Sequence, residues 1–411
     1  MEEWKEYKLG EIAQIQTGPF GSQLHKSDYV DDGVPCIMPT NIGKNLDVIS
    51  DGIAHISEND AQRLSRHLVT AGDIIYARRG DIEKCAYIQE QQNGWFCGTG
   101  CLRIRINKDA DSHFIAYQLS TSEAKSWIVG NAVGTTMLNL NSSILSDLPV
   151  LLPSLFTQRH ITAILKSLDD KIECNRRINE NLEQQAQALF KSWFVDFEPF
   201  KDQPFVESEL GMIPQGWKVG CLDDLCSFIS RGLTPKYDET SDELILGQTC
   251  VRNNIVTLNN ARKHRPKSKT EKWVQQWDIL LNSTGIGSLG RVGVVYFNMD
   301  NVAIDSHITV VRTSKSLYRH YVGRNLLSRQ LEIENMAVGS TGQTELPRDR
   351  VKTMTIIVPS DDALTKFNYI IEPMALTMYR NIEENKRLAE LRDTLLPRLM
   401  SGELKVNDVD A

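Results

Sequence analysis

The chain passes through one sequence plan twice, and this internal repeat limits its possible folds more than any other feature. Trp4 to Ile12 is echoed about 210 residues later by Trp217 to Leu225. Further matches follow in the same order: Gly72 to Ala77 with Trp277 to Asn282, Asn131 to Thr136 with Asn335 to Thr341, Leu152-Pro153 with Val358-Pro359, and Ile172 to Ile178 with Ile382 to Leu388. A solenoid would instead repeat a period of ~20 to 50 residues many times. The sequence therefore predicts two pseudo-equivalent halves that share a framework and differ in their loops.

Each half is expected to contain one α/β domain followed by one long helix, which makes the fold class α+β. The 411 residues exceed the ~250 at which single cores stop growing. We place the first domain at 1–154, a helix at 155–197, a linker at 198–216, the second domain at 217–359, a second helix at 360–402 and a tail at 403–411. Asp73 and Asp278 each precede an apolar run that predicts a strand, and we interpret both as turn-forming carboxylates.

The two helical segments carry heptad patterns typical of a coiled coil. Positions a and d of the first are Leu165, Leu168, Ile172, Asn175, Asn179, Leu182, Ala186, Leu189 and Trp193, and those of the second are Ala375, Met378, Ile382, Asn385, Ala389, Leu396 and Leu399, with Arg392 breaking the stripe. A buried asparagine fixes register, so the matched Asn175 and Asn385 indicate that the two helices lie against each other. Their nearly equal lengths, about 57 Å each, predict an antiparallel pair. The N-terminal segment is then expected where the second helix ends. The alternative is two amphipathic helices that each face a separate core.

Composition narrows the functional classes. The formal net charge of −7 argues against a protein that binds nucleic acid unaided, because phosphate neutralisation supplies much of such affinity. The eight cysteines are scattered without the spacing of a zinc site, so we expect reduced thiols. The sequence contains no signal peptide or membrane-spanning run, and we expect a cytoplasmic protein.

The chain resembles the specificity subunits of type I restriction-modification systems over nearly its whole length. The segments that carry the resemblance are Gly18 to Ser22, Ala71 to Tyr76, Leu165 to Asn175, Ala188 to Phe197 and Leu391 to Gly402. The resemblance implies two variable target-recognition domains and two conserved helical regions. It also implies a non-catalytic subunit that reads a bipartite, asymmetric site in double-stranded DNA.

The partners and cofactors are likewise implied by the resemblance. The chain would bind two methyltransferase subunits and, in the full complex, two restriction subunits. S-adenosylmethionine, ATP and magnesium would belong to those partners, and this chain would hold no cofactor and no metal. A protein-interaction adaptor built from duplicated domains is the alternative function, and an enzyme is the third.

Basic and amide side chains in matched loops are the candidates for DNA contact. Phosphate contacts are expected from Arg78, Arg79 and Lys84 in the first copy, with Arg103 and Arg105 nearby, and from Arg262, Lys263, Arg265, Lys267 and Lys269 in a loop of the second. A merely solvated charge run is the alternative for the latter. Base contacts are expected from Gln23, Asn41, Arg252 and Asn253, because arginine and amide side chains can make bidentate bonds to base edges.

Two glycine motifs suggest other chemistry but lack the required context. Gly285 to Gly290 fits GxGxxG, yet another strand pattern follows it where a dinucleotide site needs a helix. Phe96 to Gly100 imitates the FxGxG loop of adenine methyltransferases, but the sequence has no Asn/Asp-Pro-Pro-aromatic motif. His264 and His307 are isolated, and no hydrolytic constellation is apparent.

Overall fold

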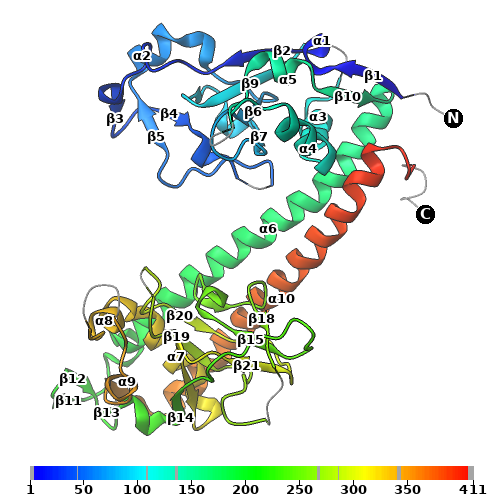
Figure 1. The fold of residues 1–411 in the computed structure, drawn as a ribbon. Coiled ribbons are helices and arrows are strands. Elements are labelled where there is room, and N and C mark those ends of the chain that lie inside the picture. The colour runs from blue at the N-terminus through cyan, green and yellow to red at the C-terminus, as the bar shows by residue number, and fades with distance from the viewer. Residues whose placement is uncertain are drawn as a thin grey trace. The chain divides into compact units, whose positions relative to one another are not determined.

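The computed structural model describes residues 4–43, 45–107, 110–134, 138–265, 269–285, 287–339 and 344–405. The chain forms two compact units (Figure 1). Unit 1 comprises Met1–Glu173 and Asn385–Ala411, and unit 2 comprises Cys174–Glu384. Both long helices therefore contribute one half to each unit. None of the helices in the described ranges is long and apolar enough to cross a membrane.

The described residues of unit 1 form two four-stranded sheets and one two-stranded sheet. The first has the order β2 (Ala13–Thr17), β9 (Cys101–Ile106), β6 (Ile74–Ala77) and β7 (Cys85–Tyr87), all antiparallel. The second has the order β3 (Tyr29–Val30), β5 (Ala54–Ile56), β4 (Val34–Ile37) and β8 (Phe96–Cys97), and β1 (Lys5–Lys8) pairs with β10 (Pro149–Leu152). The short helices are α1 (Leu9–Ile12), α2 (Glu58–Arg63), α3 (Ser112–Leu119), α4 (Ser122–Asn131) and α5 (Ser142–Ser146).

Unit 2 repeats this plan and extends it. Its main sheet has the order β14 (Cys226–Arg231), β22 (Ile308–Thr313), β19 (Ile279–Asn282), β20 (Val292–Val294), β17 (Ile255–Val256) and β16 (Val251–Arg252). The remaining strands are β18 (Arg262–Lys263), β15 (Leu244–Leu246) and β21 (Val302–Ile304) in one sheet, β13 (Lys218–Cys221) paired with β23 (Thr355–Val358), and the hairpin β11 (Phe205–Ser208) with β12 (Gly211–Pro214). The helices are α7 (Arg319–Ser328), α8 (Gln330–Asn335) and α9 (Arg348–Lys352).

The predicted repeat is confirmed at the level of strand order. The four strands β2-β9-β6-β7 correspond to β14-β22-β19-β20, with the same antiparallel neighbours. The parallel pairing of β4 with β8 recurs as β15 with β21. Unit 2 adds the β16–β17 hairpin, whose turn residues Asn253 and Asn254 have φ of 51° and 65°. Asparagine tolerates this left-handed conformation better than most residues, which suits it to such a tight turn.

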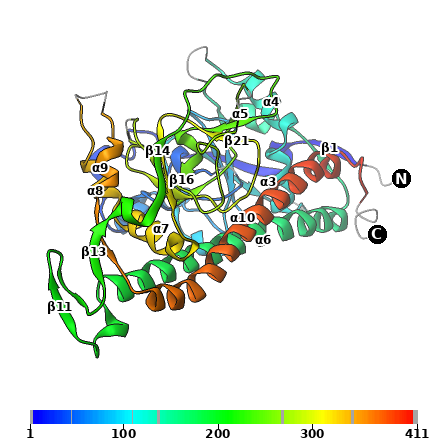
Figure 2. The same cartoon turned by 90° about the horizontal axis from the view of Figure 1, so that it is seen from below.

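The long helices α6 (Leu155–Phe194) and α10 (Asp361–Met400) contact each other within each unit (Figure 2). In unit 1, Asn385 Nδ2 donates to the carbonyl oxygen of Ile172 over 3.1 Å. In unit 2, Asn175 Nδ2 donates to Glu384 Oε2 over 2.7 Å. A second contact in each unit, Arg392 with Asp169 in unit 1 and Asn179 with the carbonyl oxygen of Met378 in unit 2, gives an antiparallel order. The predicted antiparallel helix pair is therefore confirmed in each unit.

The heptad positions lie on the inner faces of these helices. Leu165 and Asn175 are buried, and the half-buried positions are Leu168, Ile172, Leu182, Leu189, Ile382, Asn385, Ala389 and Leu396. Arg392, which interrupts the stripe, forms a 2.8 Å ion pair with Asp169 on the other helix. The interruption therefore supplies a polar contact between the two helices.

In each unit, a tryptophan packs at the end of a long helix. In unit 1, a Cβ added at Gly402 would lie 3.1 Å from Cε2 of Trp4, so the start of the first domain meets the end of α10, as predicted. In unit 2, Trp217 packs against Phe194 and Phe200, with ring centroids 5.9 and 4.9 Å away. The matched tryptophans of the repeat thus have matched structural roles.

Candidate nucleic-acid interface

The glycine-bearing loops of both copies begin at a point of close backbone approach. Gly18 follows β2, and a Cβ there would lie 2.2 Å from the carbonyl oxygen of Gly98. Gly232 follows β14, and its Cβ would lie 2.1 Å from the carbonyl oxygen of Ile304. Only glycine fits at either position without displacing backbone. The shared glycine is therefore part of the framework, and the residues after it are free to vary.

The loop after β2 meets the basic segment after β6. The guanidinium of Arg78 lies over the ring of Phe20, with Cζ 5.4 Å from the ring centroid. Phe20 is 55% exposed, and Arg79 beside it is exposed. Lys84 forms a 3.2 Å ion pair with Asp81. Of the three predicted phosphate contacts in this unit, Arg78 and Arg79 thus keep their charge available, while that of Lys84 is partly neutralised.

The two amides proposed as base readers in unit 1 differ in their surroundings. Gln23 is half-buried, and its Oε1 accepts a 3.3 Å hydrogen bond from Arg66. Asn41 is buried, its Oδ1 accepts from the backbone N–H of Met38, and its Nδ2 donates to the carbonyl oxygen of Ile49. The structure gives no support to the prediction that Asn41 reads bases, because its amide is used at both ends to hold its own turn.

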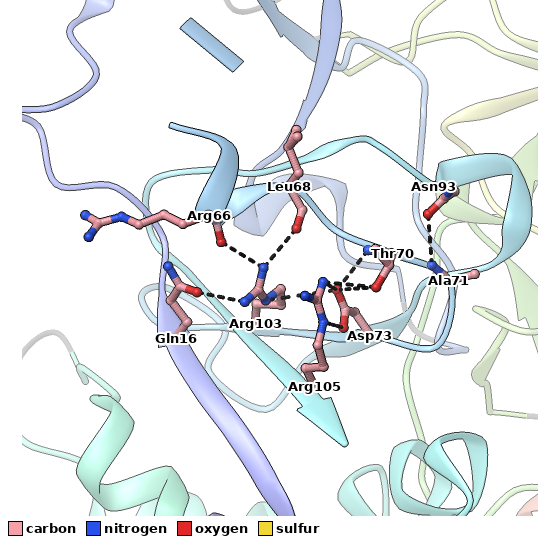
Figure 3. A network of polar contacts seen from close by, with 9 residues as sticks. All are labelled: Gln16, Arg66, Leu68, Thr70, Ala71, Asp73, Asn93, Arg103 and Arg105. Atoms are coloured by element: carbon pink, nitrogen blue, oxygen red, sulfur yellow. Dashed lines mark hydrogen bonds and ion pairs between the residues drawn. The ribbon is translucent and has the colours of Figure 1, made fainter. Parts of the chain in front are cut away.

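Arg103 and Arg105 both make hydrogen bonds within the framework (Figure 3). Arg103 donates from Nη1 to the carbonyl oxygens of Arg66 and Leu68, and from Nη2 to Gln16 Oε1. Arg105 donates from Nε and Nη2 to the two carboxylate oxygens of Asp73. We therefore correct the expectation that these arginines add to a basic face.

Asp73 also stabilises the turn before β6, as predicted from the sequence. Its Oδ2 accepts a 2.8 Å hydrogen bond from the backbone N–H of Thr70. In unit 2, Asp278 accepts the same bond from Gln275 N–H, also 2.8 Å long. The turn-forming role is confirmed in both copies.

The basic run of unit 2 begins on a strand, which corrects the expected loop. Arg262 and Lys263 form β18 and pair with β15. The Arg262 guanidinium stacks on Tyr237, with Cζ 3.4 Å from the ring centroid, and Lys263 Nζ donates to the carbonyl oxygen of Glu239. Both side chains are exposed.

Acidic neighbours offset part of this positive charge. Arg265 lies 3.8 Å from Asp238 and Lys269 lies 2.9 Å from Asp300. Lys267 lies outside the described residues. The run therefore presents fewer uncompensated charges than its sequence suggests, with Arg262 and Lys263 the strongest candidates for phosphate contact.

Arg252 and Asn253 are exposed at the β16–β17 hairpin. The next residue, Asn254, anchors the turn to α6 by donating from Nδ2 to Glu183 Oε1 over 2.9 Å. The hairpin thus presents an arginine and an amide on a fixed turn. Their accessibility suits the predicted base contacts, which remain predictions.

The alternative motifs have structural roles in this fold. The glycines from Gly285 to Gly290 connect β19 to β20, an antiparallel neighbour, so a strand follows them. His264 is buried and its Nδ1 accepts from the backbone N–H of Lys236.

The eight cysteines are free thiols. Within the part of the chain that the structure describes, no group of three or more His, Cys, Asp or Glu residues is arranged to hold a metal ion.

The sequence did not predict the contact between Phe20 and Arg78. The Gly18-Pro-Phe motif by itself predicts no role for Phe20. An aromatic residue in a polar loop is a signal of exposure, but the sequence does not place it against Arg78, which is 58 residues later.

Comparisons with known proteins agree with this architecture. Residues 1–184 match the family described as type I restriction modification DNA specificity domain. The MjaIX specificity subunit of a type I restriction enzyme from Methanocaldococcus jannaschii is 27% identical, over 99% of this chain and 95% of the relative. The HindI specificity subunit from Haemophilus influenzae is 24% identical, over 98% and 100%. The crystal structure of a type I restriction-modification S subunit from M. genitalium has the same fold, with a TM-score of 0.63 and 16% identity over 97% of this chain and 96% of that one.

Proposed function

The chain belongs to the specificity subunits of type I restriction-modification systems, and from this premise we propose that it reads a two-part DNA site, one part with each unit. The observation that carries the proposal is the repeat of one strand framework with unlike loops. A shared framework presents equivalent positions to DNA, and unlike side chains at those positions would select unlike sequences. The site should therefore be asymmetric and split.

The long helices are the proposed binding regions for two methyltransferase subunits and, in the full complex, two restriction subunits. Large apolar side chains are exposed on both helices, including Phe156 at 71% and Tyr369 at 84%. Aromatic residues are enriched in protein interfaces. A surface hollow beside Tyr369 is lined by Ser316, Leu317, Arg319, Thr365, Asn368, Glu372 and Pro373. In this proposal the partners bind S-adenosylmethionine, ATP and magnesium and perform the catalysis.

An exchange of one domain tests the proposal. Residues 217–359 are replaced by the matching segment of a relative, and the chimera is co-expressed with its methyltransferase subunit. Methylome sequencing should show one half of the site changed and the other half retained. A shift of both halves, or an assembled chimera that methylates the original site unchanged, would contradict independent reading by the two units.

The adaptor alternative is separated by a gel-shift experiment. With a net charge of −7, the isolated chain should bind specific DNA weakly, and tightly only together with the methyltransferase subunit. An adaptor without DNA specificity would show no preference for the methylated sequence in either condition. Nanomolar specific binding by the chain alone at near-physiological salt would contradict the need for partners.

A further inference from the structure

The Phe20–Arg78 contact lies at the surface of unit 1 and holds an arginine before any ligand binds. The phenyl ring is 55% exposed and the guanidinium carbon is 5.4 Å from its centroid. The backbone of Arg78 is fixed as well, because its N–H donates to Gly100 O over 2.8 Å and its carbonyl accepts from Leu140 N over 2.9 Å. Restricting a long side chain in this way lowers the entropy lost when it binds.

The surroundings of Arg78 contain polar atoms without partners. Arg78 Nε and Asn139 Oδ1 are both buried, and neither has a hydrogen-bond partner within the described ranges. Asn139 lies next to the basic segment, because it forms a β-bridge with Arg79. Buried polar atoms in native proteins are nearly always hydrogen-bonded. Within the described ranges, Arg78 therefore retains one donor, Nε, that the fold itself does not use.

The equivalent positions in unit 2 are identified by backbone hydrogen bonds. Gly18 N donates to Cys101 O and Gly232 N donates to Ile308 O, each at the first residue of the corresponding strand. Leu140 N donates to Arg78 O as Leu346 N donates to Ser283 O. Counting from these bonds, Arg78 corresponds to Ser283 and Phe20 corresponds to Thr234.

Both members of the contact change together between the units. Ser283 is buried and its hydroxyl lies 2.6 Å from that of Thr309. Unit 2 therefore builds the same framework without the arginine and without the aromatic ring. It follows that the Phe20–Arg78 contact is not needed for the fold, and that it belongs to what distinguishes one unit from the other.

We propose that Arg78 reads a guanine in the half-site bound by unit 1 and that Phe20 is the residue that positions it. The inference rests on the proposed function. Guanine presents two acceptors, O6 and N7, in the major groove, and the fork of an arginine side chain can donate to both. Arg79, which is exposed, contacts phosphate instead.

The test uses the complete chain co-expressed with its methyltransferase subunit, with methylome sequencing and gel shifts as readouts. The variants are Arg78→Ala, Arg78→Lys, Phe20→Ala and Phe20→Trp, and Arg79→Ala is the matched control. Changing Arg78 to either residue should lower discrimination at one guanine of one half-site by roughly 5- to 150-fold, with the other half-site intact. Phe20→Ala should lower discrimination at the same guanine by a smaller factor. Phe20→Trp should preserve that discrimination, because an indole also stacks on a guanidinium.

The control separates reading from charge. Arg79→Ala should weaken binding evenly on all sequences and reduce the slope of log K against log salt by about one. If both Arg78 variants also weaken binding evenly and keep the consensus, Arg78 is a phosphate contact and the inference is overturned. Arg78→Lys keeps the charge, so it decides the matter if Arg78→Ala fails to fold. A parent complex that methylates no split site would instead overturn the proposed function.

Discussion

Arg312 donates two hydrogen bonds, each 2.7 Å long, to the two carboxylate oxygens of Asp278. The carboxylate is fully buried and the arginine side chain is 14% exposed. Burial raises the pKa of Asp278, and Arg312 opposes that rise. Arg105 and Asp73 repeat the arrangement in unit 1, where the arginine side chain is 37% exposed. Each contact joins the start of a central strand to the neighbouring strand.

Removing Arg312 should destabilise unit 2 more than removing Arg105 destabilises unit 1. Arg312→Leu leaves a buried carboxylate without its cation, which costs about 3–5 kcal/mol. Arg105→Leu should cost less, because Arg105 is more exposed and Arg103 remains 4.0 Å from Asp73. Urea unfolding of each variant, followed by circular dichroism, measures the difference. An equal or larger loss for Arg105→Leu would show that exposure does not set the cost.

Alanine at either framework glycine should destabilise its unit. Gly18→Ala and Gly232→Ala place a Cβ within 2.2 and 2.1 Å of a carbonyl oxygen, and overpacking of this kind costs about 1–3 kcal/mol or more. Gly21→Ala is the matched control in the same loop, since a Cβ there has nothing within 4 Å. Thermal melting should show lower midpoints for the first two variants only. A comparable drop for Gly21→Ala would mean that the effect comes from loop flexibility and not from the close approach.

The stability of unit 2 should fall in acid because of His320. Burial lowers the pKa of His320 to about 3, assisted by the nearby Arg319 and Arg324, whereas an unfolded histidine titrates near ~6.5. The unfolded state therefore binds the proton first, so stability is intact above ~6.5 and is lost as the pH falls from there toward 3. Between pH 7 and 5 the loss should be about 2 kcal/mol. Urea unfolding of His320→Gln at pH 7 and pH 5 should show a smaller loss of unfolding free energy than the parent chain. An equal loss in the variant would contradict the role of His320.

The basic strand of unit 2 should contribute to affinity without contributing to sequence preference. Arg262→Ala combined with Lys263→Ala should lower the affinity of the assembled complex for all sequences and reduce the salt slope by roughly two. Arg265 and Lys269 should add less, because Asp238 and Asp300 already lie beside them. Lys201→Ala, which removes an exposed charge paired with Glu198, serves as the control. An unchanged slope would place β18 away from DNA.

The framework could be predicted from the sequence because its determinants recur. The repeat predicts matching strands after Asp73 and Asp278, and the heptad pattern predicts the faces on which α6 and α10 meet. Residue type alone does not reveal which face of a strand or turn a side chain occupies, so the internal hydrogen bonds of Asn41 and Arg105 could not be predicted from it. The necessary signal was present for Arg105. Asp73 and Asp278 match across the copies, and so do Arg105 and Arg312 on the next strand of each sheet.

The contacts of the loop residues could not be predicted in the same way. Phe20 and Arg78 are brought together only by the approach of the β2 loop to the end of β6, and Tyr237 reaches Arg262 only through the pairing of β15 with β18. Ser283 and Thr234 occupy the positions of Arg78 and Phe20 in the other copy, so the repeat gives no information about the contact between Phe20 and Arg78. Positions that differ between the copies are the least predictable and the most informative about specificity.

The contact between Trp4 and Gly402 has a consequence for the order in which the protein folds during synthesis. Leu399 and Met400 belong to the same buried core as Ile74 and Phe114, so the core of unit 1 is incomplete until the ribosome has added them. Unit 2 is continuous in sequence from Cys174 to Glu384, and its residues are all available earlier. Because domains fold as units during translation, we expect the second half of the chain to reach its native state before the first. A nascent chain that stops short of Leu399 would leave the earlier half with uncovered apolar residues, open to chaperones and proteases.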